Sequence, residues 1–413
     1  MASEQTFVLV GAGLASAKAA ESLRAEGFDG RVVVVGEESD LPYERPPLSK
    51  GYLLGKEERD KAFVHDQAWY DEHHIELQLG VHAEAIHRDT SELELSDGSR
   101  LRYDKLLLAT GSFPRKLTVP GADLAGVHYL RKLHESDKLK AAIETGNPRV
   151  VVIGGGWIGL ETASAAREDG CEVTLLEAAD AVLKAPLGPE MGGFFAEVQR
   201  AHGVDVRLGA KVAEIRGDGG KATAVVLEDG TELPADHVIV AVGIQPNTEL
   251  AEHAGLDVDN GVLVDASLKT SDPAIFACGD VANTLHAFYN ERIRVEHWDN
   301  AKKQGTAAGK AMAGQDVAYD VIPYFFTDQY DVGMEFVGWF KPGGYDRVVT
   351  RGDVDSQAFH AFWLAGDRVV AAMHVNQWDD GVGVQRKLIQ QHSKVDPAKL
   401  ADTETKLESL LDG

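Results

Sequence analysis

The chain of 413 residues carries 41 lysine and arginine residues against 66 aspartate and glutamate residues, a formal net charge of −25. Its length allows two or three domains, and its charge disfavours nucleic acid and acidic membranes as partners because both would repel it. The two cysteines are far apart, the histidines lack metal-ligand spacing, and no signal segment or membrane span is evident. The sequence therefore predicts a cytoplasmic protein without a disulfide framework or a metal site.

The first predicted unit is a strand, a glycine turn, a helix and a second strand. An apolar strand over Phe7–Val10 precedes the turn Gly11–Gly13, and an alanine-rich helix continues through Arg24. A β-branched run over Arg31–Val35 then leads to Glu37. This order is typical of a βαβ unit.

The same order recurs in the middle of the chain. A strand over Arg149–Ile153 leads into the glycine loop Gly154–Gly159, and a helix follows through Glu168. The next strand, Glu172–Leu176, ends at Glu177. Because the whole unit is repeated, we interpret it as a second βαβ domain.

Each glycine loop has the spacing of a dinucleotide-binding turn. The first glycine makes the tight turn, the second lets the backbone approach a pyrophosphate, and the helix N-terminus supplies free N–H groups. Gly11 and Gly13 fill the first two roles in the first loop, where Ser16 takes the third position; the second loop has glycine at all three. Two loops in the correct context favour two bound dinucleotides over plain structural turns.

The acid after the second unit distinguishes between nicotinamide cofactors. A carboxylate at this strand end accepts hydrogen bonds from the ribose hydroxyls and repels a 2′-phosphate. Glu177 therefore favours NADH over NADPH.

Beyond these units the sequence predicts further strands, a helix and a change of texture after Pro323. The later strands and helices are expected over Asp236–Val242, Ala274–Cys278, Asn300–Ala313, Glu335–Phe340, Ala358–Leu364, Val369–Val375 and Val384–His392. The alternating apolar stretches after Pro323, separated by proline and glycine turns, indicate a small antiparallel sheet in a domain of its own.

Three further motifs carry a family resemblance. Thr110-Gly111, Cys278-Gly279-Asp280 and the block from Arg45 to Lys50 resemble the flavin-binding motifs of the glutathione-reductase-like superfamily. Within it the chain is similar, over essentially its whole length, to the NADH-dependent ferredoxin reductases of bacterial oxygenase systems. The resemblance implies that the N-terminal unit binds FAD and the second unit binds NADH.

The expected fold is α/β, with two Rossmann-like dinucleotide-binding domains and a small C-terminal α+β domain. The FAD-binding domain, residues 1–112 and 243–322, is interrupted by the NAD-binding domain, residues 113–242. The C-terminal domain covers residues 323–413. Glu37 and Asp280 both suit one nucleotide site, which places the two outer segments in one domain.

The resemblance implies a set of cofactor-binding residues. Ala15 and Glu37 would hold the adenosine end of FAD, Val81 the adenine, and Arg131 with Asp280 the flavin chain, while Glu296 to Trp298 would line the ring. The full set for FAD is Gly11, Gly13, Leu14, Ala15, Glu37, Arg45, Lys50, Val81, Ala109, Thr110, Gly111, Arg131, Gly279, Asp280, Glu296, His297 and Trp298. The set for NAD is Gly154, Gly156, Trp157, Ile158, Gly159, Glu177 and Gly243.

Lys50 and Glu161 are the candidate catalytic residues. The resemblance implies that Lys50 lies beside the isoalloxazine, where a cation stabilises negative charge developing on the reduced ring. Glu161 matches the glutamate that pairs with this lysine in the family. We therefore expect a Lys50–Glu161 ion pair that orders the nicotinamide pocket.

The electrons must leave the chain, because no cysteine pair follows the first helix as it does in disulfide reductases. A flavin takes two electrons as hydride and releases them singly, which suits an iron–sulfur acceptor. The resemblance therefore implies an NADH:ferredoxin oxidoreductase that feeds a monooxygenase or dioxygenase. Because the chain is acidic, docking of an acidic ferredoxin requires local cations, and a homodimer is compatible with the same surface.

One departure from the family keeps other acceptors open. Phe326 stands where ferredoxin reductases commonly have tryptophan. The alternatives are an oxidoreductase of the apoptosis-inducing-factor or monodehydroascorbate-reductase type, which acts on a small acceptor, and a flavin-bound redox-signalling protein.

Overall fold

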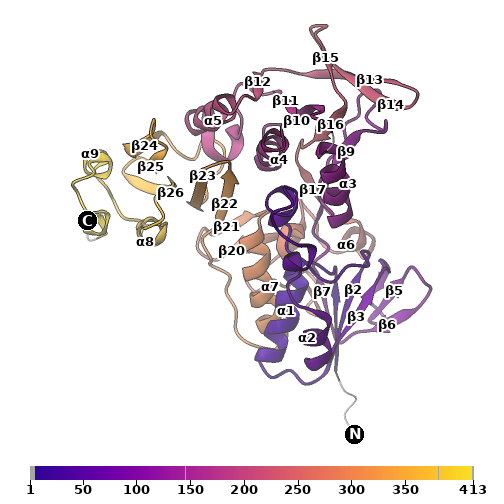
Figure 1. Cartoon of the computed structure of the whole chain (residues 1–413). Coiled ribbons are helices and arrows are strands. Elements are labelled where there is room, and N and C mark those ends of the chain that lie inside the picture. Colours follow the sequence, from indigo (N-terminus) through magenta and orange to yellow (C-terminus); the bar gives the residue numbers. More distant parts are fainter. Residues whose placement is uncertain (1–4, 145, 380, 412–413) are drawn as a thin grey trace. The chain divides into compact units, whose positions relative to one another are not determined.

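The computed structural model describes residues 5–144, 146–379 and 381–411 and divides into two compact units (Figure 1). The first unit comprises Met1–Glu44, Arg59–Phe113 and Gln245–Pro323. The second comprises Arg45–Glu58, Pro114–Ile244 and Tyr324–Gly413. The chain passes between the units within β8 (Ser112–Pro114) and β17 (Ile244–Pro246).

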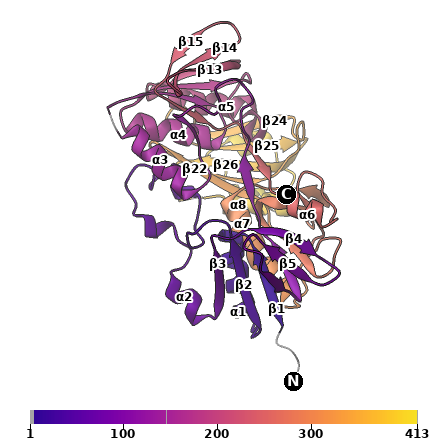
Figure 2. The ribbon, with the colours of Figure 1, turned by 90° about the vertical axis from the view of Figure 1, so that its right-hand side faces the viewer.

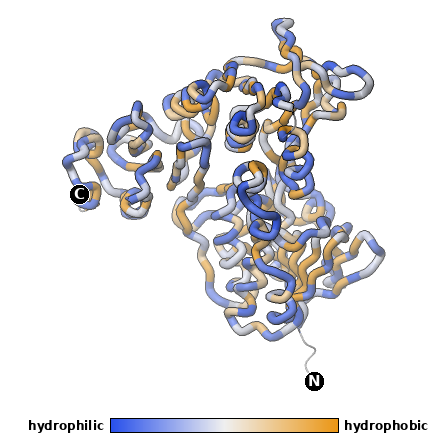
Figure 3. Tube along the Cα trace, viewed as in Figure 1, coloured by the Kyte–Doolittle hydropathy of each residue, from blue (hydrophilic) through white to orange (hydrophobic). Residues whose placement is uncertain are grey.

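A five-stranded parallel sheet forms the core of the first unit, in the order β19-β7-β1-β2-β3. Its strands are β1 (Thr6–Val10), β2 (Arg31–Gly36), β3 (Ile75–Leu79), β7 (Lys105–Leu108) and β19 (Ile275–Ala277). Val8 pairs with Val33 on one side and Leu106 on the other, and all three are fully buried. Strands β1 and β2 are buried along nearly their whole length, which explains their continuous apolar sequences (Figure 3).

Helices α1 (Leu14–Ala25) and α7 (Trp298–Met312) lie side by side in this unit (Figure 1). Two glycines of α7 make the close approach possible. A Cβ atom at Gly305 would lie 2.3 Å from the carbonyl oxygen of Ala15, and one at Gly309 would lie 2.5 Å from that of Ala19. A side chain at either position would push the helices apart.

Smaller elements complete the first unit. Two small sheets have the orders β4-β5-β6 and β18-β20-β21. The remaining elements are α2 (Gln67–Glu72), β4 (Ala83–His87), β5 (Glu92–Leu95), β6 (Arg100–Arg102), α6 (Glu249–His253), β18 (Val262–Val264), β20 (Ala282–His286), β21 (Glu291–Ile293) and the 3-10 turns Arg59–Ala62 and Gly279–Val281.

The second unit repeats the parallel sheet, in the order β12-β11-β10-β16-β9. Its strands are β9 (Val127–Tyr129), β10 (Arg149–Ile153), β11 (Glu172–Glu177), β12 (Asp205–Leu208) and β16 (His237–Val240). The helices are α3 (Leu133–Ile143), α4 (Trp157–Glu168) and α5 (Lys184–Ala201), the last kinked at Gly188. The segment between β12 and β16 forms a small antiparallel sheet, seen at the top of Figure 2, with strands β13 (Val212–Asp218), β14 (Lys221–Leu227) and β15 (Glu232–Pro234).

The C-terminal part of the second unit is a five-stranded antiparallel sheet, in the order β22-β23-β26-β25-β24. The strands are β22 (Tyr324–Gln329), β23 (Val332–Gly338), β24 (Arg347–Asp353), β25 (Ala358–Ala365) and β26 (Arg368–Val375). Helix α8 (Gly383–Gln390) packs against β26, and α9 (Pro397–Ala401) and a 3-10 turn (Leu407–Leu410) follow. The indole N–H of the buried Trp363 donates to the carbonyl of Leu187, which ties this sheet to α5.

The predicted α/β architecture and both βαβ units are confirmed. The predicted elements differ from the observed ones mainly in their boundaries, and helices α2, α3 and α5 and strands β9 and β12 were not predicted. Helix α7 begins at Trp298, before the predicted Asn300, because the His297 side chain accepts a hydrogen bond from the Asp299 N–H and caps it. The strand predicted at Glu335–Phe340 runs over Val332–Gly338 instead and ends at a glycine with φ of 113°.

The predicted domain boundaries remain a prediction. The segment Arg45–Glu58, which the sequence interpretation left in the first domain, clusters with the second compact unit. No helix in the described ranges is long and apolar enough to cross a membrane.

Candidate active site

The first glycine loop connects β1 to α1 and has room for an anionic group. Gly11 has a φ of +105°, and a Cβ there would lie 2.2 Å from the Ala109 carbonyl oxygen, so this turn requires glycine. Gly13 is the N-cap of α1 without a side-chain cap, and a Cβ there would meet nothing within 4 Å. The first turn, which begins with Leu14 and Ala15, contains no acidic residue. This open helix N-terminus fits the pyrophosphate of a dinucleotide.

A second part of the first-unit site lies at the end of β7. Thr110 donates its hydroxyl hydrogen to the Asn247 carbonyl over 2.9 Å, and the Asn247 side chain donates to the Thr110 carbonyl over 2.7 Å. Gly111, with φ of +66°, accepts from the Asn247 N–H. Asn247, which the sequence interpretation missed, therefore fixes the predicted Thr110-Gly111 motif.

Asp280 lies in the 3-10 turn that begins at Gly279 and is 8% exposed. Its carboxylate accepts a hydrogen bond of 2.8 Å from the Ser112 hydroxyl. An acidic side chain held in this way suits a hydroxyl-rich ligand chain.

The remaining first-unit candidates lie at the ends of elements. Glu37 is exposed directly after β2, and the N–H of the half-buried Val81 donates to the Gly36 carbonyl. Glu296 forms an ion pair with Arg294. His297 and Trp298 form the start of α7.

The second glycine loop has the same geometry between β10 and α4. Gly154 has a φ of +111°, and a Cβ there would lie 2.3 Å from the Ala241 carbonyl oxygen. A Cβ at Gly159 would lie 1.9 Å from the Gly154 carbonyl oxygen. Gly156 is an N-cap without a side-chain cap, and a Cβ at this position would meet nothing within 4 Å. The loop therefore also fits a pyrophosphate.

A cavity of about 510 Å³ opens beside this loop. It is lined by the loop glycines and by Glu177, Lys211 and Gly243 among others. The Glu177 carboxylate accepts hydrogen bonds of 2.7 Å from the Gly155 N–H and the Ala179 N–H. These two bonds hold an acid at the wall of the cavity, as a ribose-binding carboxylate requires.

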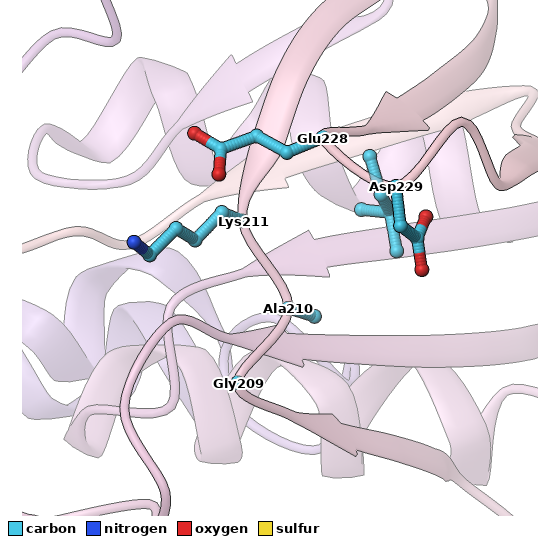
Figure 4. A pocket seen from close by; sticks show the side chains of 6 residues that line it. Gly209, Ala210, Lys211, Glu228 and Asp229 are labelled. Carbon is cyan, nitrogen blue, oxygen red and sulfur yellow. The ribbon is translucent and has the colours of Figure 1, made fainter.

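A neighbouring cavity of about 290 Å³ shares Ala210 and Lys211 with the larger one (Figure 4). In Figure 4 the side chains of Lys211 and Glu228 extend to the same side, whereas Asp229 points away from them. Lys211 was not predicted as a site residue, because a single lysine in a loop has no distinctive pattern.

Helix α4 begins with two residues of the predicted NAD set, the aromatic Trp157 and the apolar Ile158. The ring of Trp157 packs edge-on against Phe325, with ring centroids 5.2 Å apart. Ile158 is 40% exposed at the start of the same helix.

The predicted Lys50–Glu161 ion pair is present, and Glu161 has further partners. The Glu161 side chain is 5% exposed and the Lys50 side chain 17% exposed. The Glu161 carboxylate also accepts hydrogen bonds from the hydroxyls of Ser49, over 2.5 Å, and Thr327, over 2.7 Å. Three donors compensate the desolvation of this carboxylate.

The chain around Lys50 is locally rigid. A 3-10 turn, Pro46–Ser49, begins with two prolines, and the Lys50 N–H donates to the Pro47 carbonyl. The ammonium group lies 5.0 Å from the centroid of the Phe326 ring, a cation–π distance. Arg45 donates to the main-chain carbonyl of Arg131. Arg45, Lys50 and Arg131 belong to the second unit, whereas the other residues of the proposed FAD set belong to the first.

Both cysteines are free and fully buried. Burial raises the pKa of the Cys171 thiol to about 11 and raises the pKa of Cys278 still more. Thiols of this kind stay protonated and unreactive at neutral pH. Within the described ranges, no group of three or more His, Cys, Asp or Glu side chains is arranged to hold a metal ion.

Comparisons with known proteins cover nearly the whole chain. Residues 5–305 match the family described as pyridine nucleotide-disulphide oxidoreductase, and residues 324–411 match the reductase C-terminal family. A ferredoxin–NAD(+) reductase component of an anthranilate 1,2-dioxygenase system from Burkholderia cepacia is 41% identical over 99% of this chain and 100% of its own. Putidaredoxin reductase from Pseudomonas putida is 38% identical over 100% of this chain and 98% of its own.

A solved structure gives the same result. The reductase in the covalent putidaredoxin reductase–putidaredoxin complex superimposes with a TM-score of 0.95 at 37% identity. The match covers 100% of this chain and 99% of the other.

Proposed function

Because this chain belongs to the pyridine nucleotide-disulphide oxidoreductase family and has the reductase C-terminal domain, we propose that it is an NADH-dependent, FAD-containing ferredoxin reductase. FAD, when bound, accepts a hydride from NADH and releases the electrons one at a time. The observation that carries the proposal is the buried Lys50–Glu161 pair in a chain with two open dinucleotide loops.

The first loop would hold the pyrophosphate of FAD and the second that of NADH. In each, the second glycine leaves open space at an uncapped helix N-terminus, so main-chain N–H groups are available to phosphate oxygens. Glu177 would bind the adenosine ribose of NADH and disfavour the 2′-phosphate of NADPH. The other members of the two predicted sets complete these sites.

Lys50 and Glu161 would act together. The buried carboxylate holds the ammonium group in one place. The cation would then stabilise negative charge at the ring of a bound flavin. A neutral side chain at either position would leave the other charge partly buried without its partner, which is costly.

The state of the two cysteines and the names of the relatives both bear on the identity of the electron acceptor. Neither cysteine is available as a redox centre, so the electrons go to a molecule outside the chain. The relatives are named as ferredoxin reductase components of oxygenase systems, and putidaredoxin reductase is seen in complex with putidaredoxin. We infer a ferredoxin that supplies a monooxygenase or dioxygenase. A cytoplasmic location and a homodimer belong to the same proposal.

A spectroscopic assay tests the proposal. The purified protein should carry FAD, and NADH should bleach its visible absorbance. Cytochrome c reduction should then depend on an added [2Fe–2S] ferredoxin. Reduction of cytochrome c at the full rate without ferredoxin would contradict the proposal that ferredoxin is the electron acceptor. It would favour an oxidoreductase that acts on a small acceptor.

The Lys50→Met and Glu161→Gln variants test the roles of the pair. Each should slow reduction of the bound flavin by NADH about tenfold or more, because a charged hydrogen bond in a buried site is lost. Unchanged reduction rates would show that the pair is only structural.

A further inference from the structure

Glu161 receives a hydrogen bond from a distant part of the sequence. Thr327, on strand β22 of the C-terminal sheet, donates its hydroxyl hydrogen to Glu161 Oε1 over 2.7 Å, across 166 residues of sequence. Lys50 contacts the same oxygen, whereas Ser49 donates to Oε2. Thr327 is fully buried, so water does not replace this bond in the folded protein.

The direction of the Thr327 hydroxyl is fixed by its other neighbour. The Gln329 side-chain amide donates to Thr327 Oγ1 over 3.4 Å. Because the oxygen accepts this bond, its single hydrogen is free to point at Glu161.

Gln329 is itself held in place by Gln199 on α5. Gln199 Nε2 donates to Gln329 Oε1 over 2.9 Å and to Ser164 Oγ over 2.8 Å, and it also lies 3.2 Å from the Leu160 carbonyl oxygen. Gln199 and Gln329 are both buried, and Ser164 and Leu160 belong to α4, the helix that carries Glu161. The network therefore fixes β22 against the helix whose carboxylate Thr327 contacts.

We propose that Thr327 is a positioning residue for hydride transfer, which acts through Glu161 on Lys50. Its hydroxyl holds Oε1 in the orientation in which Lys50 also contacts it, so the ammonium group is presented at one place. The C-terminal domain, which also carries Phe326, thereby contributes to the reduction of the bound flavin by NADH. The inference rests on the proposed role of the Lys50–Glu161 pair.

The experiment compares three substitutions at Thr327 in the full-length, FAD-loaded protein. Thr327→Val removes the hydroxyl and keeps the shape, Thr327→Ser keeps the hydroxyl, and Thr327→Ala is a second deletion if the valine variant folds poorly. Rapid mixing with NADH gives the limiting rate of flavin reduction and the NADH concentration at half-saturation.

Thr327→Val and Thr327→Ala should lower the limiting rate about tenfold, the usual effect of one hydrogen bond to a charged group. The half-saturating NADH concentration should stay within about twofold, because Thr327 holds Glu161 and not the nucleotide. Thr327→Ser should restore the rate to within about threefold of the parent protein.

Thr162→Val is the matched control. Thr162 is equally buried and directly follows Glu161, but its hydroxyl donates to the Ile158 carbonyl over 2.7 Å and does not contact the carboxylate. This variant should reduce at the parent rate within about twofold.

A double variant tests whether the effect passes through Glu161. Thr327→Val combined with Glu161→Gln should be no slower than Glu161→Gln alone, since the two side chains act as one unit. Additive losses would overturn the inference, and so would an unchanged rate in both deletion variants or an equal loss in the control. If NADH failed to reduce the parent flavin, the proposed function itself would fall.

Discussion

The two glycine loops lie in equivalent sheets, but different glycines allow the helices of the two units to pack closely. In each sheet the loop leaves a central strand, β1 or β10, and enters a helix, α1 or α4. The second loop needs glycine at its third position, since a Cβ at Gly159 would lie 1.9 Å from the Gly154 carbonyl oxygen. The first loop has Ser16 there, fully buried.

The first unit makes its closest approach elsewhere. The glycines of α7, Gly305 and Gly309, let that helix contact the backbone of α1. The hydroxyl of Ser16 has no hydrogen-bond partner among the described residues. A buried hydroxyl without a partner lowers the stability of the folded protein. The first two glycines are present in both loops, whereas the third is required by close packing in the second loop alone.

The exchange of the third residue between the loops gives the largest expected effect. Gly159→Ser should lower NADH affinity by about 10- to 100-fold, because an overpacked Cβ must push α4 away from its strand. Ser16→Gly should leave FAD content unchanged, since the space already exists. Nucleotide titration and the flavin absorbance of the purified variants measure the two outcomes. Normal NADH binding by Gly159→Ser would contradict the packing explanation.

The second glycine should behave in the same way in both loops. Gly156→Ala should fold normally, since its Cβ meets nothing within 4 Å, but lower NADH affinity about tenfold by filling the pyrophosphate space. Gly13→Ala should lower FAD retention instead. Gly193→Ala on α5, which also has open space, is the control that should change neither. A loss of folding in Gly156→Ala would mean that the space is structural.

The acids at the strand ends differ in how they are held. Glu177 is half-buried and accepts two main-chain hydrogen bonds, whereas Glu37 is exposed. Glu177→Gln removes the charge but keeps the size, so the preference for NADH over NADPH should fall roughly tenfold. Glu37→Gln should leave that preference unchanged. The ratio of kcat/KM for the two nucleotides decides between these outcomes, and an unchanged ratio in Glu177→Gln would remove Glu177 from nucleotide selection.

Most of the confirmed predictions came from short sequence patterns. The βαβ units follow from apolar runs and glycine spacing, and the Lys50–Glu161 pair followed from family resemblance over a rigid proline block. Asn247, Lys211 and Thr327 were missed, because each reaches its site only through tertiary contacts and has no local signature. The small sheet β4-β5-β6 was missed as well, since its short strands alternate with charged, exposed residues and read as loop.

The outer strands β19 and β9 differ in their side chains, and this difference gives the smallest predicted effect. Strand β19 of the first unit is wholly buried and apolar, whereas β9 of the second carries His128, whose Nε2 lies 3.1 Å from Nδ1 of His237 on β16. Burial lowers the pKa of His128 to about 4, with His237 and Lys138 adding repulsion, and burial also lowers the pKa of His237.

A folded-state pKa below the ordinary value of about 6.5 means that the unfolded chain takes up the proton first. The second unit should therefore have its full stability above about pH 6.5 and lose part of it as the pH falls towards about 4. His128→Gln should flatten this decline, whereas His82→Gln, at an exposed position of the first unit, should not. Urea midpoints measured across this pH range provide the test. If His128→Gln lost stability on acidification as steeply as the parent, the buried pair would not be the source of the acid sensitivity.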